Sequence, residues 1–113
     1  MSQPFDIERT ARGIASRLML SGETVTGAKL ADEFGLAGSE QVRECVNWLR
    51  KQGDPSISRI ASDETGYTWA IRYEQAQATV HHLKGRAFSI LGAASGLAKS
   101  FGRTGIEQEE LSL

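Results

Sequence analysis

The stretch SEQVRECVNWLRK, residues 39–51, decides how the rest of the chain is interpreted, because it is the most clearly amphipathic helix in the sequence. Its apolar residues recur at helical spacing and collect on one stripe of a 3.6-residue helix. They are Val42, Cys45, Val46 and Leu49. Ser39 is predicted as the N-cap, and Gly53, with Pro55 beyond it, as the end of the helix. We therefore predict a helix with one buried and one presented face.

The presented face of this helix carries side chains that can read base edges. Arg43 is a planar bidentate donor of the kind that reads guanine, whereas Gln41 and Asn47 carry amides that can donate and accept, as adenine recognition requires. The same residues also suit an ordinary solvated helix face. The segments on either side of the helix are needed to choose between these two interpretations.

Two helical segments precede this stretch. Apolar spacing predicts a core helix from Asp6 to about Leu20. Thr26 can cap a second, short helix over residues 27–34, and Gly35 can adopt the positive φ of a tight exit. Two helices joined by such a short glycine-containing turn form a helix-turn-helix, which presents its second helix outward.

A hairpin is predicted after the presented helix. Residues 57–61 alternate in the manner of a strand, and a polar turn follows them. Tyr67, Trp69 and Ile71 share one face of a second strand, and we expect them to seal the core. Arg59 is expected where the hairpin could meet a phosphate. The predicted fold is mainly α with a small β-hairpin, namely a winged helix-turn-helix with a long C-terminal helix.

The C-terminal helix is predicted over about residues 74–102. Its apolar residues step alternately by four and three, which is a heptad seam sustained for more than three repeats. A helix of ~29 residues would be about 43 Å long, more than a domain this small can cover. We therefore expect a homodimer formed through this helix. The predicted dimerisation residues are Val80, Leu83, Ala87, Ile90, Ala94, Leu97 and Phe101.

Two other interpretations of the C-terminal helix stay open. The helix could fold back onto its own winged helix as a core element. It could also lie on a membrane surface, because Lys84, Arg86, Lys99 and Arg103 flank the apolar run over residues 87–98. That run is too short to span a bilayer, which requires about 20 apolar residues, so only the surface-lying form of a membrane role stays open, and we regard it as the least favoured interpretation.

Three parts of the chain are predicted. They are a winged helix-turn-helix domain (1–72), a C-terminal oligomerisation helix (73–103) and an acidic tail expected to be disordered (104–113). The tail holds Glu107, Glu109 and Glu110, and without these three the 13 basic residues of the chain face 11 acidic ones. The formal net charge of the 113 residues is -1, so any basic patch for nucleic acid must be local.

No catalytic, metal or cofactor site is predicted. Cys45 is the only cysteine, which excludes an intramolecular disulfide, and its place on the apolar stripe indicates a small buried side chain. His81 and His82 are adjacent, so on a helix they point about 100° apart and suit a shared metal poorly. No phosphate loop or hydrolase motif is present, so we expect no enzyme activity. No signal sequence is visible at the N-terminus, which predicts the cytoplasm of a bacterium or an infected bacterial cell.

The segment from Gly22 to Ala70 resembles a known family. The motifs ETVTGAKLADEFGL, VRECVNWLRKQG and GYTWA resemble, in order and spacing, the winged-helix domain at the N-terminus of biotin operon repressors and in many short phage and prophage proteins. The resemblance covers nearly half of the chain. It implies sequence-directed binding of double-stranded DNA, with the third helix in the major groove, and a role in transcriptional or replication control. The ligase portion of the biotin repressors is absent.

Two functions are therefore predicted. The first is binding of double-stranded DNA by a dimeric phage or prophage regulator, with base contacts from Gln41, Arg43 and Asn47. The predicted phosphate contacts are Thr26, Lys29, Ser39, Arg50 and Arg59. The alternative is a winged-helix adaptor that binds a host or phage protein, because Glu40 and Glu44 place acid on the presented helix.

Overall fold

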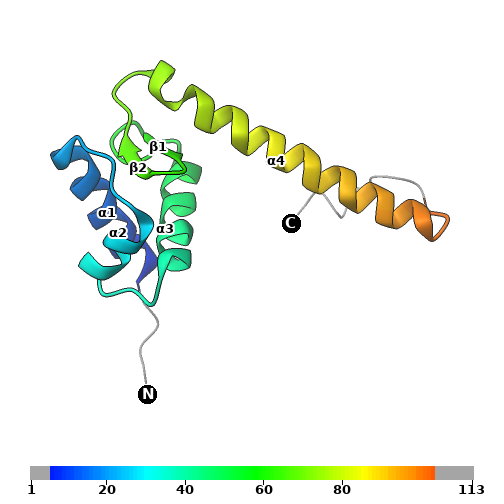
Figure 1. Ribbon diagram of the computed structural model, residues 1–113, viewed down its shortest axis with the longest axis horizontal. Helices are drawn as coiled ribbons and strands as arrows, with labels where there is room; N and C mark the ends of the chain where they lie inside the picture. The colour runs from blue at the N-terminus through cyan, green and yellow to red at the C-terminus, as the bar shows by residue number, and fades with distance from the viewer. Residues whose placement is uncertain (1–5, 104–113) are drawn as a thin grey trace. The chain divides into compact units, whose positions relative to one another are not determined.

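The computed structural model describes residues 6–103 of the chain, which divides into two units, Met1–Thr79 and Val80–Leu113. The first unit contains three helices and an antiparallel hairpin (Figure 1). The elements are α1 (Ile7–Ser21), α2 (Gly27–Glu33), α3 (Ser39–Gln52), β1 (Ile60–Asp63), β2 (Gly66–Trp69) and α4 (Tyr73–Ser100). The prediction of a mainly helical fold with a small hairpin is confirmed. The predicted acidic tail lies outside the described residues.

Helix α1 begins and ends where the sequence predicts. Asp6 is its N-cap, and the carboxylate accepts a hydrogen bond from the amide of Arg9 at 3.1 Å. Gly22 ends the helix with a φ of 65°, and its amide donates to the carbonyl oxygen of Leu18. The face of α1 that points into the core is fully buried. It consists of Ala11, Ile14, Ala15 and Leu18.

Helix α2 and the turn after it also follow the prediction closely. The hydroxyl oxygen of Thr26 accepts a hydrogen bond from the amide of Lys29 at 3.1 Å, so Thr26 caps the helix. The helix ends one residue before the predicted Phe34, and Gly35 has the expected positive φ of 65°. The amide of Leu36 then donates to the carbonyl oxygen of Ala31 and closes the turn.

Helix α3 buries the predicted stripe of Val42, Cys45, Val46 and Leu49, all at most 1% exposed. The predicted cap is wrong. Gly38 occupies the N-cap position without a side-chain bond, and Ser39 is the first helical residue. Instead, the side-chain oxygen of Gln41 accepts from the amide of Ala37 at 2.8 Å, which ties the first turn of the helix to the segment before it. At the other end, Gly53 has a φ of 61°.

The hairpin begins three residues later than the strand predicted from Ile57. Residues 54–58 form a turn, because the hydroxyl of Ser58 donates to the carbonyl oxygen of Leu49 and accepts from the amide of Asp54. This arrangement folds the chain back onto the end of α3 before it can extend. Strands β1 and β2 then pair antiparallel, from Ile60 opposite Trp69 to Asp63 opposite Gly66.

A bridge between Val25 and Tyr67, which the sequence analysis missed, adds a third extended segment beside β2. Each residue donates its amide to the carbonyl oxygen of the other at 2.8 Å. Gly66 is required at this place, because its φ is 139° and an added Cβ would lie 2.4 Å from the carbonyl oxygen of Val25. Tyr67 and Trp69 pack on the core as predicted. Ile71 does not, since it lies beyond the end of β2 and is 73% exposed.

The start of α4 is fixed to the first unit by side-chain hydrogen bonds. The buried hydroxyl of Thr79 accepts from the amide of Ser62 at 2.9 Å and donates to the carbonyl oxygen of the same residue at 3.1 Å. The side-chain oxygen of Gln75 accepts from the amides of Ile71 and Arg72. The predicted boundary between residues 72 and 73 coincides with the start of α4, but the first unit extends to Thr79 because of these bonds.

The described part of the second unit continues α4 from Val80 to Ser100, and Phe101 follows the end of the helix. The helix has 28 residues, close to the predicted length. The predicted seam is largely open to solvent over this part of the chain. Val80 is half-buried, and Leu83, Ala87, Ile90, Ala94, Leu97 and Phe101 are exposed.

Candidate nucleic-acid interface

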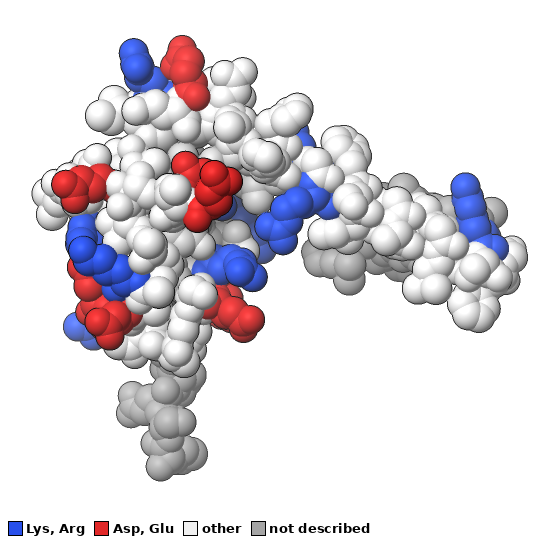
Figure 2. Space-filling view, in the orientation of Figure 1, with Lys and Arg blue, Asp and Glu red and all other residues white. Residues whose placement is uncertain are grey.

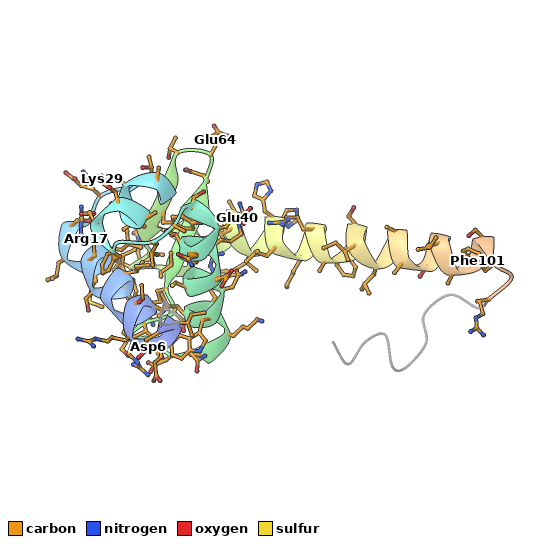
Figure 3. The ribbon with its side chains drawn as sticks, turned by 90° about the horizontal axis from the view of Figure 1, so that it is seen from below. Asp6, Arg17, Lys29, Glu40, Glu64 and Phe101 are labelled. Atoms are coloured by element: carbon orange, nitrogen blue, oxygen red, sulfur yellow. The ribbon has the colours of Figure 1, made fainter. Side chains whose placement is uncertain are left out.

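The outer face of α3 is the candidate interface. With the core stripe turned inward, the opposite side of the helix carries Glu40, Glu44, Asn47 and Lys51, all exposed. Glu40 and Arg17 lie on opposite sides of the unit (Figure 3), and Arg17, on α1, pairs with Glu33 of α2. Helix α3 therefore packs on the core with one side and exposes a polar stripe on the opposite side. This surface mixes two carboxylates with an amide and an amine.

Two of the predicted base-reading residues are free to contact a partner. Arg43 and Asn47 are exposed, and neither side chain has a hydrogen bond or ion pair within residues 6–103. Gln41 differs, because it is half-buried and its side-chain oxygen is already bound to the amide of Ala37. This bond leaves Gln41 its amide nitrogen and one further lone pair on the oxygen.

Arg50, a predicted phosphate contact, is hydrogen-bonded within the fold. Its Nε donates to the carbonyl oxygen of Ile60 at 3.0 Å, and its Nη2 donates to the hydroxyl oxygen of Ser62 at 3.0 Å. Burial lowers the pKa of this guanidinium from its ordinary value, while the nearby Tyr67 acts in the opposite direction. The position of Arg50 on the flank of α3 brings it to the hairpin, so it joins two elements of the fold.

The other predicted phosphate contacts lie at several places on the first unit. Lys29 is exposed on α2, and Thr26 is exposed at the N-terminus of that helix with its hydroxyl hydrogen still available as a donor. Ser39 is exposed in the first turn of α3. Arg59 is exposed just before β1, where it lines a shallow pocket with the start of α4.

Lys51 is a candidate contact that the sequence analysis did not select. It follows Asn47 by four residues and Glu44 by seven, so it lies on the same outward stripe of α3. Lys51 is exposed and makes no ion pair within the described part of the chain. The sequence contains a signal for Lys51: the helical spacing of the buried residues of α3 also fixes which residues lie on the opposite, exposed face.

The first unit carries a small negative charge. Residues 1–79 contain 9 basic and 11 acidic side chains, whereas residues 80–103 contain four basic side chains and no acidic one. On the face of the first unit seen in Figure 2, basic and acidic side chains are interspersed. The basic excess predicted for residues 1–103 therefore belongs to the second half of α4.

The core beneath α3 offers no reactive group. Burial, with a smaller effect of Glu44, raises the pKa of the Cys45 thiol to about 11, so the thiol is protonated at neutral pH. Trp48, also on α3, is half-buried. The guanidinium of Arg12 lies over its ring, with the Cζ atom 5.6 Å from the ring centroid. Cys45, Trp48 and Arg12 therefore pack on or beside α3 and expose no reactive group.

Comparison with known proteins gives no match to a family model, to a curated protein or to a solved structure. The resemblance to winged-helix domains therefore stays a prediction from the sequence. Within residues 6–103, no group of three or more histidine, cysteine or acidic side chains is placed to hold a metal ion. None of the described helices is long and apolar enough to cross a membrane.

Proposed function

We propose that the protein binds double-stranded DNA as a homodimer, with the outer face of α3 in the major groove and a role in phage or prophage transcription or replication. One observation carries the proposal. α3 is held outward by a core of three helices and a hairpin, while Arg43, Asn47 and Lys51 on its surface have no partner within residues 6–103. Arginine and asparagine are side chains that read guanine and adenine edges.

The surroundings of α3 support this role by keeping the helix rigid. Arg50 holds its last turns to β1, and Ser58 holds the carbonyl oxygen of Leu49. A helix fixed at several points loses little conformational freedom on binding, which favours affinity. Thr26 and Lys29 at the N-terminal end of α2 would contact phosphates and set the orientation of α3.

Substitution of exposed residues tests the proposal. Arg43→Ala should weaken binding to the preferred sequence by about 1–3 kcal/mol and relax discrimination at one base pair. Lys29→Ala should weaken binding to all sequences alike and flatten the salt dependence by about one unit. The matched control is Arg9→Ala on α1, an exposed arginine outside the candidate interface. If Arg43→Ala and Arg9→Ala behaved alike, the assigned role of α3 would be wrong.

The carboxylates on α3 separate DNA binding from a second function. Glu40 and Glu44 are exposed on the presented face and would lie near phosphates, where negative charge lowers affinity. Glu44→Gln should therefore strengthen binding to random duplex DNA at ~50 mM salt. Glu23→Gln, the same change at an exposed residue between α1 and α2, is the control.

The second candidate is an adaptor that binds a host or phage protein through the same face. It is favoured by the acidic excess of residues 1–79 and by the two carboxylates on α3. If the protein is an adaptor, Glu44→Gln should weaken its complex with a basic protein partner. The unmodified protein should then not shift random duplex DNA in a gel at ~50 mM salt. The two functions thus predict opposite effects of one substitution.

Self-association through α4 completes the proposed function. The seam residues Leu83, Ile90 and Leu97 recur every seven residues and are exposed along one face of the helix. Burying such a stripe against a partner helix is the usual way to stabilise a long amphipathic helix in water. A dimer would also double the number of contacts with DNA and increase the affinity.

A further inference from the structure

We propose that two copies of the chain pair their α4 helices antiparallel, so that Phe101 of each copy occupies a pocket at the start of the other copy's α4. The inference rests on the self-association that forms part of the proposed function, and it is independent of DNA binding. Three observations lead to it: the order of large and small residues in the seam, the distribution of cations and an apolar pocket in the first unit.

The seam alternates in size. A parallel pair in register places every seam residue opposite its own copy, so that layers of two leucines or two isoleucines would alternate with layers of two alanines. An antiparallel pair centred between Phe88 and Ser89 gives a different result. It places Val80 opposite Leu97, Leu83 opposite Ala94 and Ala87 opposite Ile90. Each layer then combines a smaller with a larger side chain, which fills the space between two helices evenly.

The charges favour the same arrangement. Residues 80–103 carry Lys84, Arg86, Lys99 and Arg103 and no acidic residue. In a parallel pair Lys84 and Arg86, which flank the seam, would each lie level with the same residue of the other copy, which is unfavourable. In the antiparallel pair Lys84 lies level with Ala93, and Arg86 with Leu91.

The same register leads Phe101 to a pocket. It places Phe101 level with Ala76, which lines a pocket of about 250 Å³ in the first unit. The other lining residues are Arg59, Ala70, Ile71, Arg72 and Tyr73. Ile71 and Tyr73 are large apolar side chains left exposed, as is Phe101, at 79%. An aromatic ring entering this pocket would cover all three side chains from water.

The residues beyond Phe101 match the charge of the pocket. Arg59 and Arg72 line it, and neither forms an ion pair within residues 6–103. The sequence after Phe101 contains Glu107, Glu109 and Glu110. In charge, these three glutamates of the sequence are opposite to the two arginines of the pocket. This complementarity favours a second copy of the chain as the occupant of the pocket.

A second copy also suits the exposed seam better than an anionic membrane surface does. Four cations next to an apolar stripe would attract acidic lipids. However, a lipid surface has no fixed shape and gains nothing from alternation between large and small residues. In the seam, Ala87 and Ala94 leave recesses that only a partner with matching side chains can fill.

Cysteine cross-linking of the full chain tests the orientation. Leu83→Cys and Ala94→Cys variants, distinguished by tags of different size, are oxidised separately and after mixing. We expect a disulfide between the two variants in the mixture and little dimer with either alone. A parallel pair would instead give Leu83→Cys linked to itself and Ala94→Cys linked to itself, which would overturn the proposal. The unmodified protein is the control, because its only thiol, Cys45, is buried.

The pocket is tested by the dimer dissociation constant, measured by sedimentation. Phe101→Ala and Tyr73→Ala should each raise it, and the double variant should raise it less than the product of the two effects, with a coupling of about two- to tenfold. Phe88→Ala is the matched control, because Phe88 is 72% exposed on α4 but lies off the seam. Independent effects of Phe101 and Tyr73 would exclude the proposed contact.

Two outcomes separate this inference from the rest of the proposed function. Loss of DNA binding with the expected cross-links intact would contradict the DNA proposal alone. A chain that stays monomeric at high concentration would overturn the antiparallel dimer. Binding of the monomeric chain to vesicles that contain acidic phospholipid would also overturn the antiparallel dimer, since a membrane surface would then be the partner of the seam.

Discussion

The Nε of Arg50 donates a hydrogen bond to the carbonyl oxygen of Ile60 at 3.0 Å and so joins the last turns of α3 to the first residue of β1. The Nη2 of the same side chain reaches the hydroxyl oxygen of Ser62. A side chain that the sequence places next to the predicted base contacts thus holds the hairpin to the helix. Its role is structural, and it can be measured apart from binding.

Arg50→Ala should therefore reduce stability more than it reduces charge-dependent binding. Hydrogen bonds from a charged group contribute about 1.5–3 kcal/mol, and we expect a loss of this size in the free energy of unfolding measured with urea. Lys51→Ala is the control, because Lys51 is exposed and should change stability by less than about 0.5 kcal/mol. Equal stabilities of the two variants would contradict the structural role of Arg50.

Thr79→Val tests the bonds that fix the start of α4. The substitution keeps the shape of the side chain but leaves the amide and carbonyl of Ser62 without the partner they have now. We expect the free energy of unfolding to fall by about 1–3 kcal/mol. Thr79→Ser retains the hydroxyl and should recover most of the loss. A smaller effect for Thr79→Val than for Thr79→Ser would show that packing, rather than hydrogen bonding, dominates here.

Gly38→Ser should stabilise the protein. Gly38 is the N-cap of α3 but has no side chain to accept from the orphaned amides, and an added Cβ meets no atom within 4 Å. A serine there supplies the cap and reduces the freedom of the unfolded chain, which together contribute about 0.5–1 kcal/mol. Thermal unfolding would measure the gain. Gly38→Ala lacks the cap and should gain less, so equal gains would argue against a capping effect.

Cys45 should make the protein sensitive to alkaline pH. Its pKa is raised to about 11 in the fold, above the ordinary value of 9.0, so the folded state favours the neutral thiol. The resulting stability is fully present below about pH 9 and is lost as the pH rises through 11. By linkage, the difference in free energy of unfolding between the unmodified protein and Cys45→Ala should shrink by about 2–3 kcal/mol between pH 9 and pH 11. A constant difference between the two proteins would exclude the effect.

The helices could be predicted from the sequence because their signals are local. Apolar residues at 3.6-residue spacing, the cap at Thr26 and glycines with positive φ define α1, α2 and α3 to within about two residues. The hairpin was placed three residues too early at its first strand. The cause was the hydrogen bonding of Ser58 to the end of α3, which depends on residues nine apart in sequence.

The part of the candidate site that depends on local signals could also be predicted. Arg43 and Asn47 are exposed because the period of the core stripe turns them outward, which the sequence shows directly. Arg50 has a similar position on the helix wheel, but its role depends on where β1 passes. No local pattern reveals that β1 lies within reach of its guanidinium. Likewise, the bridge between Val25 and Tyr67 joins residues too far apart for any periodicity to indicate.

The side chains bound to β1 have a consequence for how the protein behaves at high concentration. A strand at the edge of a sheet normally exposes amides and carbonyls that can recruit a strand from another molecule. Here Thr79 occupies both backbone groups of Ser62, and Arg50 occupies the carbonyl of Ile60. Intermolecular strand addition at β1 is thereby blocked without a proline, which protects the small sheet from aggregation.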